Sequence, residues 1–308
     1  MSTETEPISK TAVWITAMRP RTLPLALAAI VMGAFLAAAA GVFDGWVVGL
    51  AALTAVFLQI LSNLANDYGD SVHGADHIER AGPKRAVQSG QIPAATMKKA
   101  MGLFALLAAI SGIALLLVAF GLSALLVFLV FILLGGAAIG AAINYTNGKR
   151  PYGYAGLGDL FVLIFFGWVG VLGTYYLQAQ QMEWLLLLPA TSCGLLAVGV
   201  LNVNNIRDIN SDRQAGKQSI PVRVGPQKAR LYHWVLLAGA VGTAVIYVLL
   251  DYRSPWQFLF LLALPLLWRH GTAVARTHDP LRLNPMLKQL SLITLFFIIA
   301  FGIGQVVG

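Results

Sequence analysis

Charged residues are scarce in this chain of 308 residues. Only 11% of them are Asp, Glu, Lys or Arg, whereas 58% are hydrophobic and the mean hydropathy is +0.74. Soluble globular proteins carry about 25% charged residues, so this composition excludes an ordinary water-soluble domain. It indicates a protein that crosses a membrane many times, and the length suits about eight to ten spans with their loops.

Cysteine is nearly absent as well. Cys193 is the single cysteine and lies in an apolar run, which we interpret as a small buried hydrophobic position. One cysteine cannot form a disulfide or a thiolate zinc site within its own chain. The segment MSTETEPISKTAVWITAMRPRTLP (1–24) lacks the basic start and cleavage site of a signal peptide, and it predicts a cytoplasmic tail.

Apolar stretches of about twenty residues recur between polar loops and predict nine membrane-spanning helices. Their predicted bounds are 23–41, 46–65, 100–119, 122–143, 158–179, 184–204, 231–250, 256–269 and 289–307. Pro265 stands where it would kink the short eighth helix. We therefore expect an all-α membrane protein, with one membrane-embedded domain over residues 1–308.

Basic residues lie on one side of these spans. With the N-terminus in the cytoplasm, every one of the 21 Lys and Arg residues except Arg253 falls on the cytoplasmic side. This is the positive-inside pattern. It predicts a cytoplasmic tail over 1–22 and cytoplasmic loops at about 66–99, 144–157 and 205–230. The net charge of +8 then reflects topology, and we expect no nucleic-acid partner.

Acidic and amide residues gather where the second predicted span ends, in LSNLANDYGDSVHGAD (61–76). The positions that share one helical face, because they are spaced by three or four, are Asn63, Asn66, Asp67 and Asp70. Asp76 follows in a turn loosened by Gly74. A second such cluster ends the sixth span, in LNVNNIRDINSDRQAGKQS (201–219), with Asn204, Asp208 and Asp212 each four residues apart.

The two clusters resemble each other, as NDYGD (66–70) beside NNIRD (204–208), and they stand four spans apart. This favours a weak internal repeat that places them face to face across a central cavity. Acids at the membrane edge indicate function, because burying them is costly. Carboxylate and amide oxygens suit Mg²⁺, which typically binds through one or two carboxylates together with substrate phosphate oxygens. We expect one or two Mg²⁺ ions around a diphosphate.

The third cytoplasmic loop, INYTNGKRPYGYAGLGD (143–159), has too many Gly and Pro residues to continue a helix. Lys149 or Arg150 is placed to reach a diphosphate oxygen. The ring of Tyr145 is suited to face a cation.

Three motifs resemble those of the UbiA superfamily of membrane prenyltransferases. NDYGDSVHGAD (66–76) is similar to the first acidic motif, DINSD (208–212) to the second, and YTNGK (145–149) to the Tyr-x-x-x-Lys motif. Asp76 departs from the pattern, because it follows Asp70 by six residues instead of four. MRPRTLPLA (18–26) and RPYGYAGLGD (150–159) resemble the branch of the family that acts on 1,4-dihydroxy-2-naphthoate in menaquinone synthesis.

The resemblance implies nine helices around a central cavity, a polyprenyl diphosphate donor, a 1,4-dihydroxy-2-naphthoate acceptor and Mg²⁺, in a bacterial inner membrane. Decarboxylation and loss of diphosphate would give demethylmenaquinone. The implied metal ligands are Asn66, Asp67, Asp70, Asp76, Asn204, Asp208 and Asp212. The implied catalytic residues are Tyr145 and Lys149, and the implied substrate-binding residues are Arg19, Arg21, Arg150, Lys217 and Arg223.

Two other functions stay open at this point. A prenyltransferase for another aromatic acceptor, such as 4-hydroxybenzoate or homogentisate, would share the donor site. A secondary transporter would also show repeats and intramembrane acids, but it should carry polar groups near the middle of its spans. Here nearly all acids lie at one rim, which favours the enzyme.

Overall fold

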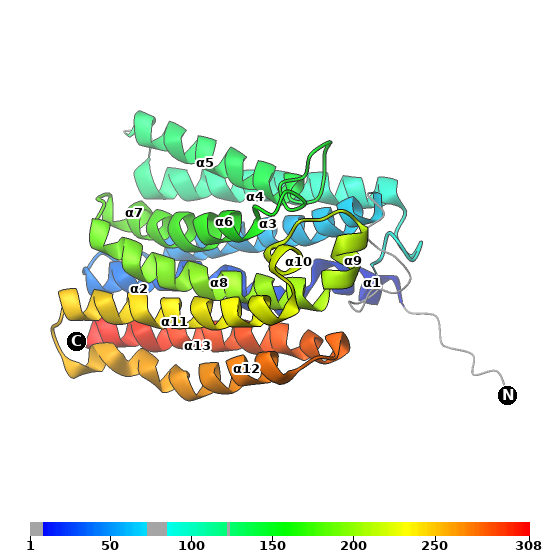
Figure 1. The fold of residues 1–308 in the computed structure, drawn as a ribbon. Coiled ribbons are helices and arrows are strands. Elements are labelled where there is room, and N and C mark those ends of the chain that lie inside the picture. Colours follow the sequence, from blue (N-terminus) through cyan, green and yellow to red (C-terminus); the bar gives the residue numbers. More distant parts are fainter. Residues whose placement is uncertain (1–8, 73–84, 122–123) are drawn as a thin grey trace.

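The computed structural model describes residues 9–72, 85–121 and 124–308. Within these ranges, nine helical segments are long and apolar enough to cross a membrane. They run side by side in one bundle, with the C-terminus at one end and α1, α9 and α10 at the other (Figure 1). The nine spans predicted from hydropathy are therefore confirmed. Asp76 lies outside the described residues.

The first four spans follow the short helix α1 (Lys10–Met18) and the 3-10 turn η1 (Pro20–Thr22). They are α2 (Leu23–Ala39), α3 (Gly45–Val72), α4 (Ala94–Phe120) and α5 (Leu125–Asn144). The fifth is composite: α6 (Gly158–Val162), a π-helical stretch η2 (Leu163–Leu172) and α7 (Gly173–Ala179). The sixth is η3 (Trp184–Leu186) with α8 (Leu187–Arg207).

Two short helices, α9 (Ile209–Gln214) and α10 (Ile220–Val224), precede the last three spans. These spans are α11 (Pro226–Leu250), then η4 (Pro255–Ala263) with α12 (Leu264–Arg276), and finally η5 (Pro280–Leu283) with α13 (Asn284–Val307). Pro265 falls where the 3-10 helix passes into α12.

Several helices continue beyond their predicted bounds at the motif end. α3 runs to Val72 instead of residue 65, and α4 begins at Ala94 instead of residue 100. Hydropathy marks only the part of a helix that matches the hydrocarbon layer, whereas polar turns extend a helix into the interface. The first acidic motif therefore lies within a helix, on the last turns of α3.

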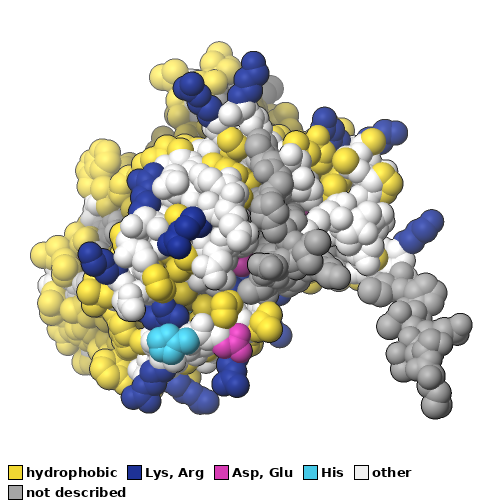
Figure 2. Space-filling model, turned by 45° about the vertical axis from the view of Figure 1, so that its right-hand side comes forward, with side chains coloured by type: hydrophobic (Ala, Val, Ile, Leu, Met, Phe, Trp, Pro, Cys, Tyr) yellow, Lys and Arg dark blue, Asp and Glu magenta, His cyan; other side chains and the backbone are white. Residues whose placement is uncertain are grey.

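The two halves of the bundle are packed differently. α2, α8, α11 and α13 contribute most of the largest buried cluster, together with parts of the fifth and eighth spans. α5, by contrast, has no buried residue. Apolar side chains cover the flank of the molecule, and Lys and Arg side chains lie around the motif end (Figure 2). This distribution matches a bundle with lipid as its lateral solvent.

Glycines allow close approach in the tight half. A Cβ added at Gly33 of α2 would lie 2.5 Å from the carbonyl oxygen of Val171 and 2.7 Å from Thr174 Cβ, both on the fifth span. α2 and the fifth span are thus in backbone contact at this point.

We expect Gly33→Leu to destabilise the protein, because overpacking a tight contact costs about 1–3 kcal/mol. Thermal unfolding in detergent measures the effect. Gly102→Leu on α4 is the matched control, since nothing lies within 4 Å of a Cβ built there. Equal melting temperatures for both variants would contradict the close contact.

Candidate active site

A cavity of about 1060 Å³ extends inward from the motif end of the bundle. Its walls come from α1, η1, α2, α3, α4, α5, the fifth span and α8. The first acidic motif and several cations line its polar end, and its interior is mainly apolar. The cavity therefore has room for a substrate with a charged head and a hydrophobic tail.

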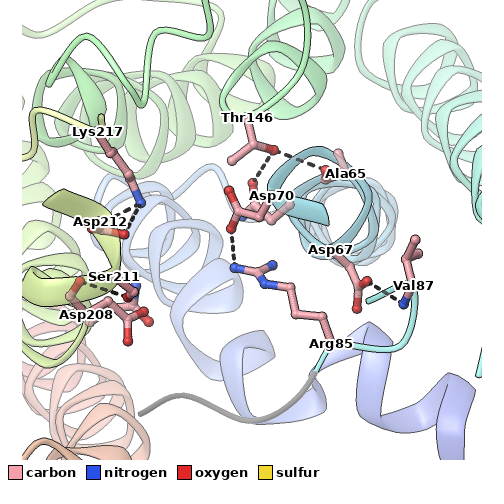
Figure 3. Close-up of polar contacts among 12 residues, drawn as sticks. Ala65, Asp67, Asp70, Arg85, Val87, Thr146, Asp208, Ser211, Asp212 and Lys217 are labelled. Carbon is pink, nitrogen blue, oxygen red and sulfur yellow. Dashed lines mark hydrogen bonds and ion pairs between the residues drawn. The ribbon is translucent and has the colours of Figure 1, made fainter. Parts of the chain in front are cut away.

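The first motif presents two buried carboxylates that point in different directions (Figure 3). Asp70 forms an ion pair with Arg85 and accepts a hydrogen bond from the hydroxyl of Tyr154 at 3.2 Å. Asp67 accepts hydrogen bonds from the backbone N–H groups of Ala86 and Val87, each at 3.0 Å. Asp67 thus anchors the backbone at Ala86 and Val87, whereas Asp70 faces the second motif.

The second motif straddles a helix break. α8 ends at Arg207, Asp208 caps it, and Asp212 lies on α9. The guanidinium of Arg207 donates two hydrogen bonds to the carboxylate of Asp208, from Nε to Oδ1 at 2.8 Å and from Nη2 to Oδ2 at 2.6 Å. It also donates to the side-chain oxygens of Asn204 and Asn284, both at 2.8 Å. Arg207 thereby fixes the orientation of Asp208 and ties α8 to α13.

Lys217 occupies the space between the motifs. Its Nζ lies 3.3 Å from Asp212 Oδ2 and 5.9 Å from the ring centre of Tyr145. Burial alone would lower the pKa of Lys217, but nearby carboxylates, Asp212 foremost, raise this pKa above its ordinary value. Lys217 therefore stays cationic. Burial raises the pKa of the Tyr145 phenol, which stays neutral.

The third loop is held against α3 and α10. The Thr146 hydroxyl donates to the carbonyl of Ala65 at 3.1 Å and to Asn66 Oδ1 at 3.3 Å. Arg223 donates to the carbonyl of Ala155 at 2.7 Å. These contacts hold Tyr145 in the cavity wall.

The predicted site residues are only partly brought together. Those that line the cavity are Arg19, Arg21, Asn66, Asp67, Asp70, Tyr145, Asn204 and Lys217. Asp208 and Asp212 stand just behind this lining, buried beside Arg207 and Lys217. Lys149 and Arg150 are exposed on the third loop, outside the cavity lining. Arg223 also lies outside it, where it holds the loop.

The sequence did not predict the contacts that Arg207, Tyr154 and Arg85 make with the acidic motifs. Each of the three binds a motif acid. Arg207 adjoins Asp208 in the chain, yet adjacency alone does not predict a bidentate pair. Tyr154 and Arg85 reach Asp70 only through the folding of their loops.

The donor set suits Mg²⁺ held together with a diphosphate. Within the described ranges, no three His, Cys, Asp or Glu side chains converge closely enough to hold a metal alone. Asp212 Oδ2 is buried, and among the described residues it has an ionic contact with Lys217 but no hydrogen-bond partner. Mg²⁺ usually takes one or two carboxylates and completes its shell with water and phosphate oxygens, so separated carboxylates fit this ion.

A model of the UbiA prenyltransferase family matches residues 26–293. The chain belongs to this family. It is 49% identical to the 1,4-dihydroxy-2-naphthoate octaprenyltransferase of Escherichia coli (strain K12) over 97% of each chain.

Two solved UbiA homologues share the fold. An apo structure from Aeropyrum pernix K1 has a TM-score of 0.66 at 20% identity, over 94% of this chain and 98% of that one. A structure from Archaeoglobus fulgidus bound to GPP and Mg²⁺ has a TM-score of 0.62 at 15% identity, over 97% of this chain and 100% of that one. The fold is thus that of a UbiA-type helical bundle.

We expect Gly69→Ala to reduce kcat/KM at least tenfold. An added Cβ would lie 2.5 Å from the Thr146 hydroxyl oxygen and 2.6 Å from the Thr146 carbonyl oxygen, so the third loop must move away from α3. Gly49→Ala, on the same helix with open space around it, should keep full activity. Steady-state kinetics compares the two, and unchanged kinetics in Gly69→Ala would show that the loop position does not matter.

Proposed function

We propose that this enzyme transfers a polyprenyl group from polyprenyl diphosphate to 1,4-dihydroxy-2-naphthoate. The C–O bond between the prenyl C1 and the diphosphate breaks, and the electron-rich ring forms a bond to that carbon. The ring carboxylate leaves as CO₂, so the product is demethylmenaquinone in its quinol form. The observation that supports this function most directly is that two acidic motifs face each other beside the polar end of an apolar cavity, in a chain so similar to a naphthoate octaprenyltransferase.

The polar end of the cavity is suited to the leaving diphosphate. Bound there with Asp70, Asp208 and Asp212, Mg²⁺ would neutralise the negative charge that develops on the departing phosphate. Lys217 adds a fixed positive charge at the same end. Asn66 and Asn204 also line the cavity, and their amide oxygens accept hydrogen bonds from Thr146 and Arg207.

The apolar end is suited to the prenyl chain and to its reactive form. An allylic cation is quenched by water, so a cavity walled by aliphatic and aromatic side chains protects it until the ring attacks. Tyr145 and Tyr152 both line the cavity, with their ring centres 5.4 Å apart. Their electron-rich faces are suited to stabilise a nearby carbocation.

The detergent-purified protein should prenylate 1,4-dihydroxy-2-naphthoate only when Mg²⁺ is present. We expect Asp70→Asn and Asp208→Asn each to lower kcat/KM roughly 100-fold, as losing a preorganised electrostatic group does. Mass spectrometry detects the quinol. Asp279→Asn, an exposed helix cap outside the cavity, is the matched control. Product with 4-hydroxybenzoate but none with the naphthoate would keep the donor site and refute the acceptor.

We propose that the motif end faces the cytoplasm of a bacterial inner membrane, because the basic residues gather there. In a Cys193→Ser background, Arg213→Cys should react with an impermeant thiol reagent only in inside-out vesicles. Tyr252→Cys, exposed at the opposite end, should react only in right-side-out vesicles. The reverse pattern would invert the topology.

A further inference from the structure

The side of α3 that lines the cavity changes its chemistry in three steps along the helix. The lining positions recur at intervals of three and four residues: Ala51, Thr54, Ala55, Leu58, Gln59, Ser62, Asn63, Asn66, Asp67 and Asp70. The first four positions, Ala51 to Leu58, are apolar except Thr54, whose hydroxyl is hydrogen-bonded within the protein. The next four carry amides or a hydroxyl, and the last two are the carboxylates of the first motif. We call this row the α3 stripe.

The apolar part of the α3 stripe offers no free polar group. The Thr54 hydroxyl donates to the carbonyl of Leu50 at 2.8 Å and lies 2.9 Å from Ser111 Oγ. Thr54 therefore adds mainly its methyl group to the cavity wall. A prenyl tail needs no polar partner, so this part of the stripe suits it.

The middle of the α3 stripe is different, because some of its polar groups have no hydrogen-bond partner among the described residues. The amide nitrogen of Gln59 donates to Thr22 Oγ1 at 3.1 Å and to Asn63 Oδ1 at 3.4 Å, while its Oε1 accepts nothing from the described chain. The Ser62 side chain makes no hydrogen bond with any described residue. Asn63 is committed, since its amide nitrogen donates to the carbonyl of Met18 at 2.9 Å and to Thr22 Oγ1 at 3.0 Å.

Arg21 supplies a cation to the same cavity. It lines the wall beside Thr22 and is partly buried. Among the described residues it has neither an ion pair nor a hydrogen bond, whereas Arg85, Arg207 and Lys217 are each engaged by an acid. A half-buried guanidinium facing a cavity is suited to a carboxylate.

We propose that Gln59, Ser62 and Arg21 form the binding site for the aromatic acceptor. This inference rests on the proposed function. Gln59 Oε1 accepts a hydrogen bond from a ring hydroxyl, Ser62 hydrogen-bonds the second oxygen of the ring, and Arg21 pairs with the ring carboxylate. The donor has no polar group beyond its diphosphate, so free hydrogen-bonding groups below the carboxylates serve the other substrate.

The depth of this site agrees with the reaction. At 1.5 Å per residue, Gln59 lies about 12 Å along the helix axis from Asp67, and Ser62 lies about 12 Å from Asp70. A ring bound there sits on the membrane side of the diphosphate and next to the prenyl C1. The α3 stripe thus orders three parts of the reaction on one rigid helix: tail, ring and diphosphate.

The test measures KM for each substrate separately. We expect Ser62→Ala and Gln59→Leu each to raise KM for 1,4-dihydroxy-2-naphthoate roughly tenfold, while KM for polyprenyl diphosphate stays within about twofold. Ser62→Ala is the more telling variant, because it removes no hydrogen bond within the described chain. A general folding defect would affect both substrates.

Acceptor analogues provide a second measurement. The wild type should prefer 1,4-dihydroxy-2-naphthoate over 1-hydroxy-2-naphthoate, and at least one of the two variants should lose that preference. Gln178→Leu, which removes a glutamine hydrogen-bonded to Asp44 N–H outside the cavity, is the matched control and should leave both KM values unchanged.

The outcomes separate this inference from the proposed function. Turnover by the wild type with unaltered acceptor KM in both variants would overturn the acceptor site alone. A parallel rise in both KM values would also overturn it, because the stripe would then serve the donor. Failure of the wild type to prenylate the naphthoate would defeat the proposed function, and the acceptor site with it.

Discussion

Carboxylates buried at the edge of a membrane are tolerated only when a counter-charge accompanies them, and this constraint organises the motif end of the bundle. Asp70 pairs with Arg85, Asp208 with Arg207, and Asp212 with Lys217. Removing one partner from a buried pair typically costs about 3–5 kcal/mol, since the other charge is left unpaired. The cations therefore do more than give the motif end its positive charge. They hold each acid in place and join loops, helix ends and neighbouring spans around the cavity mouth.

The same pairs explain why the acids in the described part of the chain do not form a closed metal cage. Each carboxylate turns toward its own cation, and Asp67 is turned to the backbone at Ala86 and Val87. A cage built from protein alone would bind Mg²⁺ without substrate. Separated carboxylates leave coordination positions for phosphate oxygens, so a bound ion and the diphosphate would complete each other's binding. The arrangement thus favours a metal that arrives with the substrate.

Hydropathy and residue spacing predicted the spans and the face of the first motif. The features that they did not predict depend on tertiary contacts. The nine spans follow from the thickness of the hydrocarbon layer, and intervals of three and four placed Asp67 and Asp70 on one helix. The same spacing did not predict the break at Asp208, because helix ends depend on tertiary contacts such as those of Arg207. Lys149 matched a motif, yet its loop leaves it exposed. The ion pair between Arg85 and Asp70 depends on the tertiary fold, which local sequence patterns do not predict.

Rigidity in this bundle is unevenly distributed, and the distribution suits the two demands on the cavity. The reacting atoms need groups fixed to within a fraction of an ångström, and α8 provides this through close packing with α11, α13 and the fifth span. The tail needs only a dry wall that adapts to its shape. α5 lines the cavity without burying any residue of its own, so it makes few close contacts that would fix the shape of this wall. The groups near the diphosphate are thereby held precisely, whereas the wall around the prenyl tail is packed less closely.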